Sequence, residues 1–140
     1  MKMALCEARE AGEQGEVPIG AVIVSGDRIV GRGHNLVETL NDVTAHAEMQ
    51  AITAASETLG GKYLPECTLY VTVEPCAMCA AALGWAQIGR VVYGAPDEKR
   101  GYRKIYGNGR GPFHPRTSIA GGVLARECGA LMTDFFKTLR

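Results

Sequence analysis

Residues 72–85 read TVEPCAMCAAALGW, and the rest of the chain can be arranged around the two cysteines in this stretch. Its first residues predict the end of a strand, and its small residues after the second cysteine predict a helix. Pro75 suits the first position of that helix, because its missing N–H would be unpaired there in any case. Cys76 and Cys79 are three residues apart, so they share one face of the helix and converge on one point. A helix N-terminus also favours the thiolate that a metal ion needs.

A Cys-x-x-Cys pair alone is also typical of thioredoxin-like redox sites and of structural zinc sites. The upstream segment TAHAE, residues 44–48, supplies a third candidate ligand, His46, and a nearby carboxylate, Glu48. Residues two apart point about 200° apart on a helix, so both must lie in its first turn to share a site. Three protein ligands leave the fourth position of zinc to water, which distinguishes a catalytic from a structural zinc. The combined H-x-E and P-C-x-x-C pattern matches the signature of zinc-dependent nucleobase deaminases, with Glu48 as the acid–base residue.

Length and composition predict a single globular domain over residues 1–140, with 46% hydrophobic residues. The sequence shows neither an apolar stretch of about 20 residues nor a signal-peptide core, so we expect no membrane association and a cytoplasmic location. Five cysteines are an odd number, which argues against a disulfide framework. We expect Cys6, Cys67 and Cys128 to be buried, inert thiols.

The charge is unevenly distributed along the chain, although its formal total is zero. Residues 1–86 hold 5 Lys and Arg against 11 Asp and Glu, a net charge of −6, whereas residues 87–140 hold 10 against 4, a net charge of +6. Such asymmetry is a hint of a polyanionic partner. The alternative is that the two sets mix on the folded surface.

Hydrophobic patterns predict an α/β fold. The expected elements, in order, are a helix over residues 1–14, strands over 17–24 and 28–33 joined by a Ser25-Gly26-Asp27 turn, an irregular segment over 36–43, a helix that begins near His46 and ends at Gly60-Gly61, a strand over 68–73, a helix over 77–87, a strand over 90–93, a short apolar segment at Ile119 and a C-terminal helix. This order indicates a central sheet with helices packed on it.

The segment 97–115 lacks a hydrophobic period and is rich in glycine and proline, so we expect a long loop. It carries cations with interleaved aromatic residues, namely Lys99, Arg100, Tyr102, Arg103, Lys104, Tyr106 and Arg110. Such a mixture suits single-stranded nucleic acid, whose bases stack and whose phosphates pair with cations. The alternative is a solvated, mobile loop.

The motifs together resemble one family. GEVPIGAVIV (15–24), Asn35, TAHAE (44–48), TLYVTVEPCAMC (68–79), IGRVVYGA (88–95) and DFF (134–136) make the sequence similar to bacterial tRNA-specific adenosine deaminases of the cytidine deaminase-like superfamily. The resemblance implies a three-layer α/β/α sandwich with a central five-stranded mixed sheet, and a homodimer. It also implies the conversion of the wobble adenosine of a tRNA anticodon to inosine, with the anticodon stem-loop as partner.

The resemblance implies roles for particular residues. His46, Cys76 and Cys79 would hold one zinc ion per chain, with water as the fourth ligand, and Glu48 would carry protons. The residues expected to contact the substrate are Asn35, Ala47, Asp97, Lys99 and Phe135. Glu74 is expected either to cap the helix that follows it or to contact an exocyclic amine.

Two departures from the family pattern keep an alternative open. Trp85-Ala86-Gln87 replaces the His-Ser-Arg of many members, and a Trp-Ala pair recurs there in related guanine deaminases. The segment after Asp97 is also short and lacks a Gly-Ser-Leu element. The alternative function is therefore deamination of a free base or nucleoside such as guanine or cytosine. A non-catalytic zinc-stabilised binding module would need a fourth protein ligand. Trp85 itself is expected in the core or at a dimer interface.

Overall fold

The strands form one five-stranded mixed sheet in the order β2-β1-β3-β4-β5. A computed structural model describes residues 1–139. In the sheet, β1 (Gly20–Ser25) is antiparallel to both β2 (Arg28–His34) and β3 (Cys67–Val73), whereas β4 (Arg90–Ala95) and β5 (Ser118–Ala120) run parallel to β3. The predicted central five-stranded mixed sheet is therefore confirmed.

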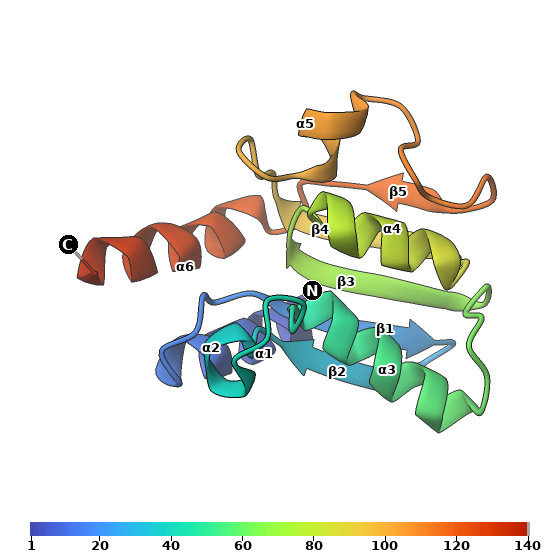
Figure 1. Ribbon diagram of the computed structural model, residues 1–140, viewed down its shortest axis with the longest axis horizontal. Helices are drawn as coiled ribbons and strands as arrows, with labels where there is room; N and C mark the ends of the chain where they lie inside the picture. Colours follow the sequence, from blue (N-terminus) through green and yellow to red (C-terminus); the bar gives the residue numbers. More distant parts are fainter. Residues whose placement is uncertain (140) are drawn as a thin grey trace.

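Helices cover both faces of the sheet (Figure 1). α1 (Lys2–Glu13) and α6 (Ala125–Thr138) pack on one face, and α3 (Ala47–Leu59) and α4 (Ala77–Trp85) pack on the other. Two short helices, α2 (Val37–Leu40) and α5 (Tyr102–Tyr106), lie in the connections. The result is the three-layer α/β/α sandwich that the sequence predicts. No helix in the described part of the chain is long and apolar enough to cross a membrane.

Small residues allow α3 to lie directly on β2. A Cβ atom at Gly33 would stand 2.4 Å from the carbonyl oxygen of Ala47, and one at Gly31 would stand 2.5 Å from that of Ala51. Contacts this short are with helix backbone, which has little freedom to move aside. The glycines of β2 and the alanines of α3 therefore set the distance between helix and sheet, and with it the place where α3 begins.

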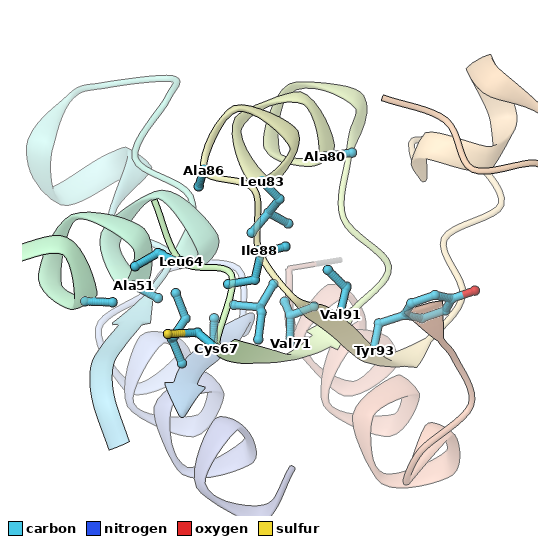
Figure 2. Close-up of a cluster of buried hydrophobic side chains, with 14 of the residues drawn as sticks. Ala51, Leu64, Cys67, Val71, Ala80, Leu83, Ala86, Ile88, Val91 and Tyr93 are labelled. Carbon is cyan, nitrogen blue, oxygen red and sulfur yellow. The ribbon is translucent and has the colours of Figure 1, made fainter. Parts of the chain in front are cut away.

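α4 is held by larger apolar side chains. Leu83 of α4 and the nearby Ile88 are buried against Val71 of β3 and Val91 of β4 (Figure 2). Burial of each such side chain contributes roughly 1.5–3 kcal/mol relative to exposure. This contact fixes α4 on the middle of the sheet, and α4 begins directly after Cys76.

The predicted order of the main elements is confirmed, with shifts of a few residues at their ends. The first strand begins at Gly20, because Pro18 lacks the N–H that a sheet ladder needs. The expectation of irregular structure is wrong over residues 37–40 and 102–106, where α2 and α5 lie. Helices of four and five residues are too short to display a hydrophobic period.

Distant side chains stabilise both short helices. The buried carboxylate of Glu16 accepts hydrogen bonds from the N–H groups of Glu38 (3.0 Å) and Thr39 (2.7 Å), at the start of α2. Tyr102 of α5 packs edge-on against Phe113, with ring centroids 5.0 Å apart. These partners lie 11 to 23 residues away along the chain, so local sequence does not reveal them.

Two expectations about single residues need correction. Cys67 and Cys128 are buried as predicted, but Cys6 is exposed. It follows Leu5 by one residue, about 100° around α1, and so faces away from the sheet. Trp85 is 83% exposed, so its placement in the core of the chain is wrong.

The sheet order also separates the two charged halves of the sequence. β1 and β2, from the acidic half, lie on one side of β3, whereas β4 and β5, from the basic half, lie on the other side. Figure 1 shows α5 and α6 with the basic half, and α2 and α3 with the acidic half. The two halves of the sequence are therefore largely separated in the fold, although Glu74 of the first half pairs with Arg103 of the second.

Candidate active site

The N-termini of α3 and α4 meet at the three predicted metal ligands. His46 is the residue before α3 and Cys76 the residue before α4, and both have extended backbone conformations. The His46 Nδ1 atom lies 3.4 Å from the Sγ atom of Cys79 and 3.6 Å from that of Cys76. His46 and Glu48 thus both lie at the first turn of a helix, as their two-residue spacing requires.

The separations fit a zinc ion. All three ligand atoms lie within 4.8 Å of one another. Zinc bound at about 2.3 Å to sulfur and about 2.0–2.1 Å to nitrogen, with tetrahedral angles, places those two ligand atoms about 3.6 Å apart. His46 Nδ1 is separated from the two sulfurs by this distance to within a few tenths of an ångström. A Cys₂His set also leaves one tetrahedral position for water.

The thiol groups are arranged for metal binding. A hydrogen bond from Cys79 lowers the pKa of Cys76 to about 4, against the opposing effect of burial, and His46 adds to the lowering. The same hydrogen bond and burial raise the pKa of Cys79. The hydrogen bond with Cys76 raises the pKa of His46 in turn. A thiolate is therefore favoured at Cys76, and a metal ion replaces the remaining protons when it binds.

Glu48 is placed beside the ligands without being one of them. It lies in the first turn of α3, with its side chain buried near Cys79 and His46. Burial raises the pKa of its carboxyl group to about 7. A group with a pKa near the working pH is well suited to accept a proton and to return it.

Asn35 and Ala47 flank the metal ligands. Asn35 follows β2 and is buried, and its Oδ1 atom accepts a hydrogen bond from Val37 N (3.2 Å). The next residue, Leu36, donates its N–H to the carbonyl oxygen of Ala45 (2.9 Å), which brings this segment beside His46. Ala47 is fully buried at the start of α3.

Asp97, Lys99 and Phe135 differ in their surroundings. Asp97 organises its own turn, because its Oδ1 atom accepts hydrogen bonds from the N–H groups of Lys99 (3.1 Å) and Arg100 (3.0 Å). Lys99 is exposed. Phe135 is half-buried on α6 and packs edge-on against Phe136, with ring centroids 5.3 Å apart. α6 projects well beyond the sheet (Figure 1).

Glu74 is a site residue whose role the sequence leaves open between two interpretations. Its buried carboxylate accepts hydrogen bonds from Asp97 N (3.2 Å), Arg103 N (3.1 Å) and Arg103 Nη2 (2.9 Å). Burial raises the pKa of this carboxyl group, but the hydrogen bonds from Arg103 and Asp97 outweigh it and hold the pKa below its usual range. The group is therefore an anion that binds the segment opposite it.

The basic segment 97–115 is only partly available to a nucleic acid. Tyr102 is buried against Phe113, so the prediction that it offers a stacking surface is wrong. Arg103 is paired with Glu74, and Arg110 donates hydrogen bonds to the carbonyl oxygens of His114 and Thr117. The exposed cations of the segment's first half are Lys99, Arg100 and Lys104.

The site belongs to a known class of protein. The sequence profile described as "Cytidine and deoxycytidylate deaminase zinc-binding region" matches residues 1–95, which include His46, Glu48, Cys76 and Cys79. The chain is therefore a member of this zinc-dependent deaminase family.

Within this deaminase family, the chain is similar over its full length to proteins that act on tRNA. Over its full length the chain is 44% identical to the tRNA-specific adenosine deaminase of Agrobacterium fabrum and 45% identical to that of Bacillus subtilis, and it spans 93% and 88% of those proteins. It is 42% identical over 98% of its length to the chloroplastic tRNA(adenine(34)) deaminase of Arabidopsis thaliana, but spans only 12% of that protein.

Solved structures give the same fold. A structure from a study of A-to-I editing by tRNA:A34 deaminases at the wobble position is 44% identical, with a TM-score of 0.85 over 94% of this chain and 96% of that one. The guanine deaminase of Bacillus subtilis is 45% identical, with a TM-score of 0.66 over 68% of this chain and 61% of that one.

We predict that Cys76→Ala abolishes stoichiometric zinc binding, because two of the three ligand atoms do not hold the ion firmly. The matched control is Cys67→Ala, which removes a buried thiol from β3, away from the ligands. Zinc per chain, measured by elemental analysis of the purified proteins, should fall from near one to near zero only in the first variant. Full zinc content in Cys76→Ala contradicts the assignment.

Proposed function

We propose that this protein deaminates the wobble adenosine of a tRNA anticodon hydrolytically to inosine and releases ammonia. The observation that carries the proposal is the complete set of His46, Glu48, Cys76 and Cys79 in one site of a chain that is 44–45% identical over its full length to tRNA-specific adenosine deaminases. A partial match, or a site lacking the acid–base residue, would support the fold alone.

The geometry supports a hydrolytic mechanism. His46, Cys76 and Cys79 would hold the zinc ion, which would lower the pKa of a bound water molecule and so supply a nucleophile at neutral pH. Glu48 accepts the proton of this water and passes it to a ring nitrogen of the base, which makes the carbon bearing the amine more electrophilic. The water oxygen adds to that carbon, which is C6 in adenine. Glu48 then takes the remaining proton of the added hydroxyl group and delivers it to the amine; the C–N bond breaks, ammonia leaves, and a 6-oxo base remains.

Residues around the ligands are suited to orient the substrate. Asn35 would hydrogen-bond the target nucleotide, and Ala47 would contact it at the start of α3. Lys99, exposed on the turn that Asp97 organises, would pair with a backbone phosphate. Phe135, on the projecting α6, would meet the anticodon loop. Each of these roles places a different part of an RNA hairpin around one buried metal site.

Guanine deamination is the second candidate. It is favoured by the Trp85-Ala86 pair and by the similarity to the guanine deaminase of Bacillus subtilis. Trp85, however, is six residues beyond Cys79, which is about 9 Å along a helix at 1.5 Å per residue. Within one chain it therefore cannot stack on a base that is held at the metal. The Trp85-Ala86 pair therefore favours the second candidate only as a likeness in sequence, and not through a contact of Trp85 with the base.

We also propose that the protein is a cytoplasmic homodimer. Trp85 and Tyr63 are exposed by 83% and 53%, and the hydrogen bond from Leu64 N to Ala86 O brings their backbones close together. Exposed aromatic side chains that gather in this way are typical of an interface.

Trp85→Glu should convert the dimer to a monomer in sedimentation experiments, whereas Val43→Glu, at an 80% exposed site, should leave it intact. A wild-type monomer, or a Trp85→Glu dimer, excludes this interface.

The substrate proposal is tested with zinc-loaded protein and an anticodon stem-loop that carries a wobble adenosine. Free guanine, cytosine, adenosine and cytidine are assayed in parallel, and both inosine and ammonia are measured. We expect inosine at the wobble position alone, because the substrate-facing residues surround an extended ligand. Ammonia from a free base, without inosine in the hairpin, overturns the proposal in favour of the second candidate.

Glu48→Ala should retain about one zinc per chain but lose turnover by at least about 100-fold, because general acid–base catalysis commonly contributes this much or more. Metal content and single-turnover deamination of the stem-loop measure the two effects separately. Turnover near the wild-type rate would exclude Glu48 as the residue that carries the protons.

A further inference from the structure

Glu74 binds the two ends of the segment 97–103. One carboxylate oxygen, Oε1, accepts from Asp97 N (3.2 Å) and from Arg103 Nη2 (2.9 Å). The other, Oε2, accepts from Arg103 N (3.1 Å). A carboxylate with this many donors is strongly bound, because each bond involves a charged group. The side chain of Glu74 is 1% exposed, so water competes little for it.

Backbone contacts place this segment against the metal ligands. Tyr102 donates its N–H to the carbonyl oxygen of Pro75 (2.8 Å), and Gly101 forms an isolated β-bridge with Cys76. Any Cβ atom at Gly101 would collide with the Glu74 carboxylate, so the segment lies as close as glycine permits. The turn that presents Lys99 is therefore separated from the ligand Cys76 by only a few residues of tightly packed chain.

Arg103 is held on two sides. Its guanidinium group pairs with Glu74 and lies 5.6 Å from the centre of the Tyr93 ring. Its Nε atom is buried and has no hydrogen-bond partner among residues 1–139. The Arg103 guanidinium group lacks one hydrogen bond in this position, and its contacts with the Glu74 carboxylate and the Tyr93 ring offset that loss.

The turn between these anchors behaves as one unit. The Asp97 side chain accepts from the N–H groups of both Lys99 and Arg100. Glu74 holds this unit at Asp97 and again at Arg103. The Glu74 carboxylate and the Arg103 guanidinium group therefore help to place the exposed cations relative to the metal, together with the backbone contacts at Gly101 and Tyr102.

We propose that Glu74 and Arg103 are positioning residues that hold the Asp97–Arg100 turn beside the metal ligands and thereby set the affinity for the RNA substrate. This inference rests on the proposed function. If the pair is broken, Lys99 samples many positions and substrate binding pays an ordering cost, whereas Glu48 and the metal ligands stay in place on α3 and α4. The pair therefore acts on KM and not on kcat.

Salt dependence separates this role from a direct contact with RNA. A cation that pairs with a phosphate of a single strand contributes about 0.7 to the slope of log affinity against log salt concentration. Lys99→Met should lower the slope by about this amount, because its side chain is exposed and free to pair. Arg103→Met removes the same charge four residues away, but should leave the slope unchanged.

The experiment compares Arg103→Met with Lys99→Met and wild type, all zinc-loaded, on the anticodon stem-loop. For Arg103→Met we expect KM to rise about tenfold, kcat to stay within about twofold, and zinc to remain near one per chain. Glu74→Gln should raise KM at least as much, because it also weakens the bonds from Asp97 N and Arg103 N, and the double variant should be no worse than Glu74→Gln, since the Arg103 side chain acts through Glu74. A wild-type KM, additive effects, lost zinc, or a salt slope lowered as in Lys99→Met each overturns the proposal.

A second measurement does not depend on activity. Hydrogen exchange of the amides in segment 97–103 should be at least about tenfold faster in zinc-loaded Arg103→Met than in wild type, with exchange in β3 and α4 unchanged. Unchanged exchange in the segment overturns the positioning role even if the protein deaminates another substrate. Failure of the wild-type protein to convert the hairpin, by contrast, overturns the proposed function and leaves the exchange result to decide the positioning role.

Discussion

The meeting of two helix N-termini at one point constrains the whole molecule. His46 immediately precedes α3 and Cys76 immediately precedes α4. The His46 Nδ1 atom lies 3.6 Å from the Cys76 Sγ atom. α3 reaches this point because Gly31 and Gly33 allow it to touch the backbone of β2, whereas α4 reaches it through Leu83 and the central strands. A shift of either helix by one residue, about 1.5 Å, would break the fit to a tetrahedral ion. The packing of the helices on the sheet therefore also determines the geometry of the metal site.

Much of this arrangement can be predicted from sequence, because its signals are local. His46 and Glu48, two residues apart, can share a site only at a helix start, and the Pro-Cys-x-x-Cys segment favours a second helix start. α5 was not predictable from periodicity, because it has only five residues and depends on packing between Tyr102 and Phe113. The partner of Glu74 lies 29 residues away, and no local pattern marks such a pair.

The burial of single side chains was harder to predict than the positions of the helices and strands. A cysteine is usually buried, but whether Cys6 faces the sheet depends on the phase of α1, and it faces solvent. A tryptophan is usually buried too, yet Trp85 ends its helix in an exposed position. The fold is common to relatives with different substrates, since it is shared by a tRNA:A34 deaminase structure and a guanine deaminase. The segments around the metal, which long-range contacts hold in place, therefore determine the choice of substrate.

The segregation of charge across the sheet has a consequence at long range. Residues 1–86 and 87–140 carry −6 and +6, and the strand order puts them on opposite sides of β3. Such a molecule has no net charge, but the separation of its positive and negative sides gives it an electric dipole. A uniform electric field therefore rotates the molecule without exerting a net force on it. A polyanion at a distance of about a Debye length, roughly 8–10 Å at ordinary ionic strength, would rotate the protein until the basic side faces it. The encounter would then begin on the side of the molecule that holds β4, β5 and α5.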